Sequence, residues 1–161
     1  MLKTCGRAAL VAMALALAGP AALFAQGRPL RVTGVRDLQF GTVIPGVPAL
    51  ILRTDAANSG QYSLTGEKNG GVQLQFTLPT AMNGPSGATM PLSFGASDAG
   101  FSQAETVTSQ VGFDPRVPFV GTLSNNGRAA VFLGGQALPA GGQRSGTYTA
   151  TITLTVSYVG L

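Results

Sequence analysis

Residues 147–158 read TYTATITLTVSY, and this stretch decides the fold class. Every second residue is Thr or Ser, and most of the residues between them are apolar or aromatic. Such period-two alternation predicts a β-strand with one face on a core and the other in solvent. We expect one strand over 147–158, about 40 Å long at the usual rise of ~3.3 Å per residue. Its predicted core residues are Tyr148, Ile152, Leu154, Val156 and Tyr158.

The same alternation recurs in shorter form along the rest of the chain. Residues 72–78 read VQLQFTL and end at Pro79. Shorter candidate strands cover 50–53, 61–65, 90–94, 117–123 and 129–133. Turn signals such as Pro45-Gly46 and Asn83-Gly84-Pro85 separate them, and no stretch after residue 25 has a helical period. Closely spaced strands and turns favour an all-β sandwich or barrel over βαβ units.

Two stretches leave alternatives open. Residues 97–110 are polar and poor in large apolar side chains, which fits a long loop or an edge strand. Residues 30–43 alternate at both ends but change phase near 34–37. A phase change indicates a bulge or a break. Either one strand bends there, or an arm over 28–36 precedes a first strand over 38–43.

The first 25 residues have the three parts of a secretory signal peptide. Lys3 and Arg7 precede the apolar run 8–18, and Leu23-Phe24-Ala25 offers a small residue at the cut point. This pattern predicts cleavage after Ala25 and export to the periplasm, the cell surface or the medium. The alternative is a retained membrane anchor, but Gly19-Pro20 interrupts the apolar run. We therefore expect a signal peptide over 1–25, one domain over 26–161 and no stable membrane insertion.

Composition excludes most catalytic chemistry. The 161 residues contain no His and no Trp, Cys5 is the only cysteine, and charged residues make up 10% against a usual value of about 25%. Without His there is no Ser-His-Asp triad and no histidine metal ligand, and without a second Cys there is no zinc cluster. We expect no enzymatic activity, no small-molecule substrate, no metal and no cofactor.

Other patterns favour structural roles over binding sites. Eight of the ten basic residues follow residue 25, scattered singly, so a nucleic-acid partner is not expected. The glycine pairs at 70–71, 134–135 and 141–142 lack the context of phosphate loops and fit turns. Asp55 and Asn58 fit an Asx turn better than a calcium loop.

The order of short motifs resembles a known family. These motifs are DLQFGTVIPG at 37–46, LTGE at 64–67 followed by 72–79, and SGTY at 145–148 opening the Thr-rich strand. Together they resemble the bacterial domain-of-unknown-function 4402 (DUF4402) family across residues 30–161. That family is similar to the spore coat protein U-like domains and to the pilins of the chaperone–usher pathway.

The resemblance implies a fold and a role. It implies an immunoglobulin-like, pilin-like antiparallel β-sandwich that serves as a fimbrial or adhesive subunit of the bacterial surface. The expected partners are like subunits or other surface proteins, joined by strand addition. Leu30, Val32 and Gly34, which share one register in the 28–36 arm, are the candidate subunit contacts, unless the arm is a bulged edge strand of its own sheet. The rival function is a soluble periplasmic or extracellular module that binds glycans.

Overall fold

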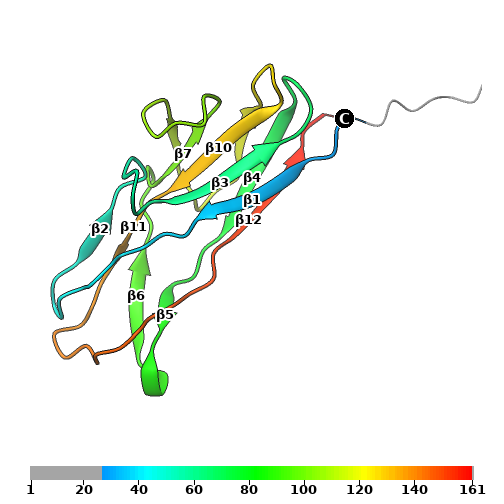
Figure 1. Cartoon of the computed structure of the whole chain (residues 1–161). Coiled ribbons are helices and arrows are strands. Elements are labelled where there is room, and N and C mark those ends of the chain that lie inside the picture. Colours follow the sequence, from blue (N-terminus) through cyan, green and yellow to red (C-terminus); the bar gives the residue numbers. More distant parts are fainter. Residues whose placement is uncertain (1–26, 161) are drawn as a thin grey trace, which may run out of the picture.

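The computed structural model describes residues 27–160, so the predicted signal peptide lies outside the described residues. Twelve β-strands and one short 3-10 turn, η1 (Pro85–Gly87), follow one another along this part of the chain (Figure 1). The strands are β1 (Arg31–Arg36), β2 (Ala49–Ile51), β3 (Gly60–Thr65), β4 (Gly71–Thr77), β5 (Ala81–Asn83), β6 (Thr89–Ser93), β7 (Ala99–Ser102), β8 (Val111–Phe113), β9 (Phe119–Thr122), β10 (Arg128–Leu133), β11 (Gly135–Ala137) and β12 (Thr153–Tyr158). Within residues 27–160, no helix is long and apolar enough to cross a membrane.

The strands form three antiparallel sheets. The largest has the order β1-β3-β10-β7-β8, and a three-stranded sheet has the order β12-β4-β9. A third sheet, β2-β11-β6-β5, continues the molecule at one end (Figure 1). Each strand pair is antiparallel, and the predicted all-β antiparallel sandwich is confirmed.

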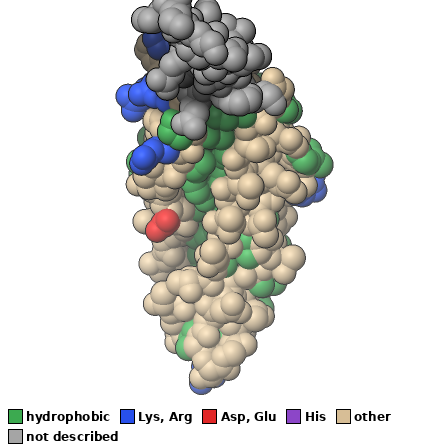
Figure 2. All heavy atoms as spheres, turned by 90° about the vertical axis from the view of Figure 1, so that its right-hand side faces the viewer, with side chains coloured by type: hydrophobic (Ala, Val, Ile, Leu, Met, Phe, Trp, Pro, Cys, Tyr) green, Lys and Arg blue, Asp and Glu red, His purple; other side chains and the backbone are tan. Residues whose placement is uncertain are grey.

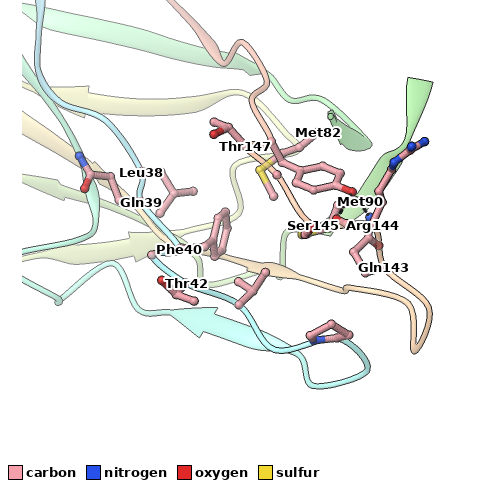
Figure 3. Close-up of a pocket in the computed structure, with 15 residues that line it drawn as sticks. Leu38, Gln39, Phe40, Thr42, Met82, Met90, Gln143, Arg144, Ser145 and Thr147 are labelled. Carbon is pink, nitrogen blue, oxygen red and sulfur yellow. Dashed lines mark hydrogen bonds between the residues drawn. The ribbon is translucent and has the colours of Figure 1, made fainter. Parts of the chain in front are cut away.

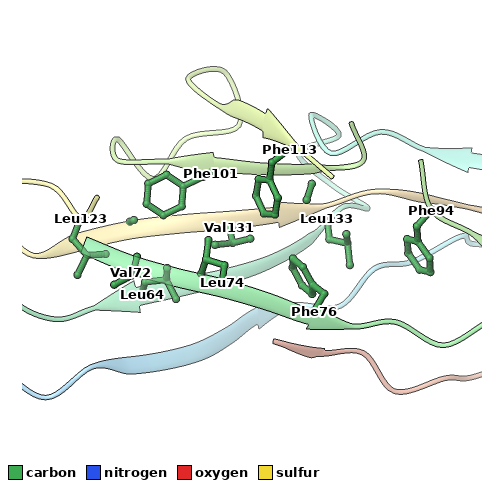
Figure 4. Packing of buried hydrophobic residues seen from close by; sticks show 12 residues of the cluster. Leu64, Val72, Leu74, Phe76, Phe94, Phe101, Phe113, Leu123, Val131 and Leu133 are labelled. Atoms are coloured by element: carbon green, nitrogen blue, oxygen red, sulfur yellow. The ribbon is translucent and has the colours of Figure 1, made fainter. Parts of the chain in front are cut away.

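The main core lies between the five-stranded and the three-stranded sheets (Figure 4). The larger sheet contributes residues such as Leu64 and Val131, and β4 contributes Val72, Leu74 and Phe76. In β4 every second residue is buried, as the VQLQFTL alternation predicts. A smaller cluster around Met82, Met90 and Ala137 forms the core of the four-stranded sheet.

Several predicted strands are confirmed, with bounds that differ by a few residues. They are the candidates over 50–53, 61–65, 72–78, 90–94, 117–123 and 129–133, which correspond to β2, β3, β4, β6, β9 and β10. The short strands β5, β8 and β11 have no counterpart among the predictions. Each has only three residues, too few to show a period.

The predicted strand over 147–158 is wrong in its first half. Only Thr153–Tyr158 pairs with β4, in a register that sets Thr153 opposite Thr77. Residue 152 would next face Leu78, and residue 151 would face Pro79, which has no N–H to donate to a ladder. Before β12, Thr149 makes an isolated bridge with Asn83.

The interpretation of residues 97–110 as a loop or an edge strand is also wrong in part. Ala99–Ser102 forms β7, an interior strand of the largest sheet that lies between β10 and β8. All four of its residues are buried. Phe101 is the one large apolar residue among them, so the segment lacks the run of large apolar side chains that usually marks an interior strand.

The two alternatives for residues 30–43 are resolved for this chain. Residues 31–36 form β1, an edge strand paired with β3, and the register shifts between Gly34 and Arg36. This shift is the bulge that the phase change indicated. The structure therefore places residues 31–36 of the arm in its own sheet. Residues 38–43 form no strand, so the alternative with a first strand over 38–43 is wrong, and the single bulged strand ends at Arg36.

Candidate functional site

The inner face of β1 is incompletely covered. Val32 lies directly opposite Leu64 of β3, and directly opposed residues point to the same face of a sheet. Leu64 is fully buried, whereas Val32 is 38% exposed. Leu30, two residues earlier in the same register, is partly buried against the main core. An apolar side chain that points inward is thus left partly in solvent.

The inner face of β12 shows the same feature on the other sheet. Leu154 lies opposite Phe76, and Val156 lies opposite Leu74, both of which are buried. Leu154 and Val156 themselves are only half-buried, as are Ile152 and Tyr158. The alternation predicted for this strand is confirmed, because exposed and half-buried residues alternate throughout β12. Its inner residues pack on the core without closing over it.

The two half-covered faces meet along one side of the molecule, which we call the seam. Residues 28–36 form one side of the seam and residues 147–158 form the other. β1 and β12 are the edges of their sheets on this side (Figure 1). Figure 2, which views the molecule from there, shows a line of hydrophobic side chains that runs lengthwise between two ridges.

The opposite side of the sandwich carries aromatic rings between its edge strands, although Val111 of β8, which lies opposite buried Phe101, is 64% exposed. There the edge strands are β8 and β9, and each contributes a phenylalanine to the gap between the sheets. The rings of Phe113 and Phe119 stack with centroids 4.2 Å apart, and Phe119 also contacts Phe101 at 5.8 Å. The seam has no such aromatic pair between β1 and β12 in the described part of the chain.

The two edge strands of the seam differ in how well they are protected against further pairing. β1 carries Arg31, Arg36 and a bulge, which are features that discourage the pairing of an edge with another strand. The guanidinium of Arg36 donates hydrogen bonds to Ser59, to its carbonyl oxygen at 2.7 Å and its hydroxyl at 3.0 Å. β12 and the residues around it, from 145 to 160, contain no charged residue and no proline. Among the described strands, β12 pairs only with β4, so its outer edge is open.

A tyrosine hydroxyl joins the two sides at one end of the seam. The Tyr158 hydroxyl donates a hydrogen bond to the carbonyl oxygen of Arg28 at 2.7 Å. The same hydroxyl accepts one from the backbone N–H of Glu67 at 2.6 Å. A carboxylate oxygen of Glu67 in turn accepts from the N–H of Arg28 at 2.9 Å. Tyr158 therefore holds the start of the N-terminal segment beside the last strand.

A cleft of about 590 Å³ continues the seam at its other end. Phe40, from the segment after β1, and Met82, on β5, turn toward one another from its two sides (Figure 3). Leu38 and Met90 add to the apolar lining, and Gln143 and Ser145 supply polar groups.

Tyr148 forms one wall of the cleft and is held in place by polar contacts. Its hydroxyl donates to the carbonyl oxygen of Arg144 at 2.7 Å and accepts from the side-chain amide of Gln143 at 2.6 Å. The same Gln143 amide reaches the carbonyl oxygen of Thr89 at 3.2 Å. A Cβ on Gly84 would overlap the Tyr148 ring, so the ring rests directly on the backbone there.

The polar candidates take local roles. The Asp55 carboxylate accepts the backbone N–H groups of Ala57 and Asn58 at 2.8 and 3.0 Å, which confirms the predicted Asx turn. The side-chain amide of Asn58, together with these N–H donors, lowers the pKa of Asp55. Arg116 pairs with Asp114 at 2.7 Å and lowers the pKa of that carboxyl from 3.8 to about 2. Within residues 27–160, no three Asp, Glu, His or Cys side chains lie together as a metal-binding group would.

The structure brings the two predicted sets of residues to the same place. Leu30, Val32 and Gly34 lie on one side of the seam. Tyr148, Ile152, Leu154, Val156 and Tyr158 lie on the other side. A side chain at Gly34 would meet no atom within 4 Å, so no close backbone contact within this chain requires a glycine there.

Sequence reasoning predicted Tyr148, as a core residue, but missed the other apolar residues that line the cleft. Phe40 lies in the stretch where the phase changes, and Met82 lies in the three-residue strand β5. Met90 lies in a predicted strand, but nothing marked it as part of a site. No pattern in the sequence singles these residues out, because uncharged runs such as 38–52 are common in this chain and residues 69–97 carry no charge either. Comparison with known proteins finds no matching family model and no curated protein of significant sequence similarity.

Proposed function

We propose that this chain is an exported, non-enzymatic subunit of a bacterial cell-surface assembly, of a fimbrial or adhesive kind, and that it joins its neighbours along the seam. The proposal rests on one observation above all. The inner residues of both edge strands point at the core, yet their side chains remain partly exposed while the residues beside them are buried. Partly exposed apolar surface of this kind is typical of protein interaction sites.

Backbone chemistry supports the same surface. An unpaired strand edge offers N–H and C=O groups to an added strand, and β12 carries neither charge nor proline to prevent pairing. An added strand would gain ladder hydrogen bonds, and its alternate side chains would cover Leu154 and Val156. The resemblance to the DUF4402 family and to pilin-like domains agrees with this role.

The second candidate function is a soluble periplasmic or extracellular module that binds glycans. The cleft between Phe40 and Met82 favours it, because about 590 Å³ lies within the usual range of small-ligand sites. Its wall is held by the Tyr148 and Gln143 hydrogen bonds, which would limit reorganisation on binding.

The test compares two substitutions on neighbouring residues of β1. Val32→Glu places a carboxylate on the seam, whereas Thr33→Glu places it on the exposed outer face of the same strand. Measured by light scattering across a concentration series, the wild-type protein and Thr33→Glu should self-associate. Val32→Glu should associate at least about tenfold more weakly. A tenfold loss of affinity corresponds to ~1.4 kcal/mol, and burial of an unpaired charge in the interface costs more than that.

Two results would contradict the subunit role. One is equal association of Val32→Glu and Thr33→Glu, which would show that the seam takes no part in assembly. The other is a wild-type protein that stays monomeric while it binds glycans saturably. That result would support the ligand-binding module instead.

A further inference from the structure

A second apolar surface lies away from the seam, in β2 and directly before and after it. Its residues are Ile44, Val47, Leu50 and Leu52, which are 65%, 52%, 56% and 56% exposed. We call these four residues the β2 patch. Large apolar side chains grouped with this much exposure on a folded domain usually mark an interaction surface.

The β2 patch is a fixed feature of the fold. Ile44 and Val47 are the ends of a turn closed by a hydrogen bond from the Val47 N–H to the Ile44 carbonyl oxygen at 3.0 Å. Gly46, at φ +77°, donates its N–H to the carbonyl oxygens of Pro139 and Ala140 at 3.2 and 3.1 Å. Leu50 lies in β2, which pairs with β11. Among the described strands, β2 is an edge of its sheet and has a free side.

The β2 patch and the C-terminal side of the seam both lack charge, whereas the β1 side of the seam carries Arg31 and Arg36. No charged residue occurs from Leu38 to Leu52, and none occurs from Ser145 to Gly160 on the C-terminal side of the seam. Contact between these two segments would cover apolar side chains. It would remove no charge from water, because neither segment carries one. Burial of unpaired charge is the largest cost that opposes association.

The positions of the two surfaces decide how copies would combine. β2 and the β1–β12 edges lie on opposite sides of the molecule (Figure 1). The β2 patch therefore cannot contact the seam of its own chain. It can contact the seam of another copy, and a contact between unlike surfaces of two copies repeats in one direction. Such a contact leaves one free patch and one free seam at the two ends of each row.

We propose that the β2 patch of one copy docks on the seam of the next, so that a second copy of this chain is the occupant of the seam. This inference rests on the proposed function, because it names the partner for the same surface. The docking covers Ile44, Val47, Leu50 and Leu52 of one copy and the partly exposed Val32, Leu154 and Val156 of the next. The expected product is an open row of subunits.

The experiment uses two variants of the exported protein, each defective in one surface. Leu50→Glu alters the β2 patch and leaves the seam intact, and Val32→Glu does the reverse. Val120→Glu is the matched control, because Val120 is 60% exposed on β9, away from both surfaces. All three sites are exposed, and circular dichroism and thermal melting are used to check that each variant is folded.

The expected result is that each variant associates weakly alone and that the mixture of the two recovers association, which requires that the β2 patch binds the seam. Wild type and Val120→Glu form rows in light scattering, whereas Leu50→Glu and Val32→Glu alone associate at least tenfold more weakly. An equimolar mixture of these two variants recovers strong association but stops at two chains. Each such pair joins the intact patch of Val32→Glu to the intact seam of Leu50→Glu.

Other outcomes overturn the inference and separate it from the proposed function. If Leu50→Glu forms rows like the wild type while Val32→Glu does not, the seam still joins subunits but the β2 patch is not its occupant. If the mixture stays monomeric, the two surfaces do not bind one another. If Val32→Glu assembles like the wild type, or the wild type stays monomeric, the proposed function fails as well.

Discussion

Two tyrosines show how one side chain serves both packing and polar contacts. The rings of Tyr148 and Tyr158 pack against the smaller and the main apolar cluster respectively. Each hydroxyl both donates to a backbone carbonyl oxygen and accepts a hydrogen bond. An amphipathic aromatic side chain suits a position that is half-buried, because its polar end keeps a partner at the edge of the core. These residues hold the two ends of the seam.

Replacement of Gly84 tests the packing of the Tyr148 ring. Gly84→Ala adds a methyl group where the ring lies, and the ring cannot move freely because its hydroxyl is bound on both sides. We expect the free energy of unfolding to fall by about 1–3 kcal/mol, as in other overpacked sites. Urea denaturation measures this change. Gly34→Ala is the control, since its Cβ meets nothing within 4 Å, and a loss as large there would contradict the steric explanation.

The Asp114–Arg116 pair predicts a specific titration. Hydrogen bonds from Arg116 lower the pKa of Asp114 to about 2, so the carboxylate stays charged well below pH 3.8. The folded-state pKa is depressed, and the stabilisation by this pair is therefore present above pH 3.8 and lost as the pH falls toward 2. The carboxyl carbon of Asp114, followed by NMR, should titrate near pH 2. In Arg116→Gln the midpoint should rise toward 3.8, and an unchanged midpoint would refute the assigned cause.

At the scale of elements, the length of a strand is set by its partner. The alternation in 147–158 describes which side chains face inward, and it holds through β12. The ladder begins only at Thr153, because β4 ends at Thr77 and Pro79 follows two residues later. Residues 147–152 leave β4 and reach instead the four-stranded sheet, where Thr149 pairs with Asn83.

The alternation in β12 predicts unequal effects of charge on its two faces. Val156→Asp places a carboxylate against buried Leu74 and should lower the free energy of unfolding by about 1–3 kcal/mol. The loss is moderate for an inward position, since the open seam leaves Val156 half-buried. Thr153→Asp, on the exposed face, should change stability by less than about 0.5 kcal/mol. Equal shifts of the urea midpoint in the two variants would show that the faces are misassigned.

At the scale of the whole molecule, the two sides of the sandwich differ. On one side the rings of Phe113 and Phe119 stack between the sheets, and on the other the inner faces of β1 and β12 are partly exposed without such a pair. The β2 patch adds a further exposed apolar surface on the side away from the seam. A molecule with two such partly exposed apolar surfaces, in different positions, has the means to form linear arrays. The light-scattering experiments on Val32 and Leu50 variants test this property directly.

The sequence by itself determined the fold class, most of the strands and the inward-facing residues of β12. These features depend on local alternation and on turn residues, which a single segment displays. It also indicated the bulge in residues 30–43 through the change of phase. Sequence did not reveal β7 as an interior strand, because a four-residue strand with one large apolar side chain resembles a loop. Only the tertiary structure decided that β1 and β12 are facing edges with an open seam, since exposure depends on which segments lie across the gap, and alternation within one strand carries no information about its neighbours.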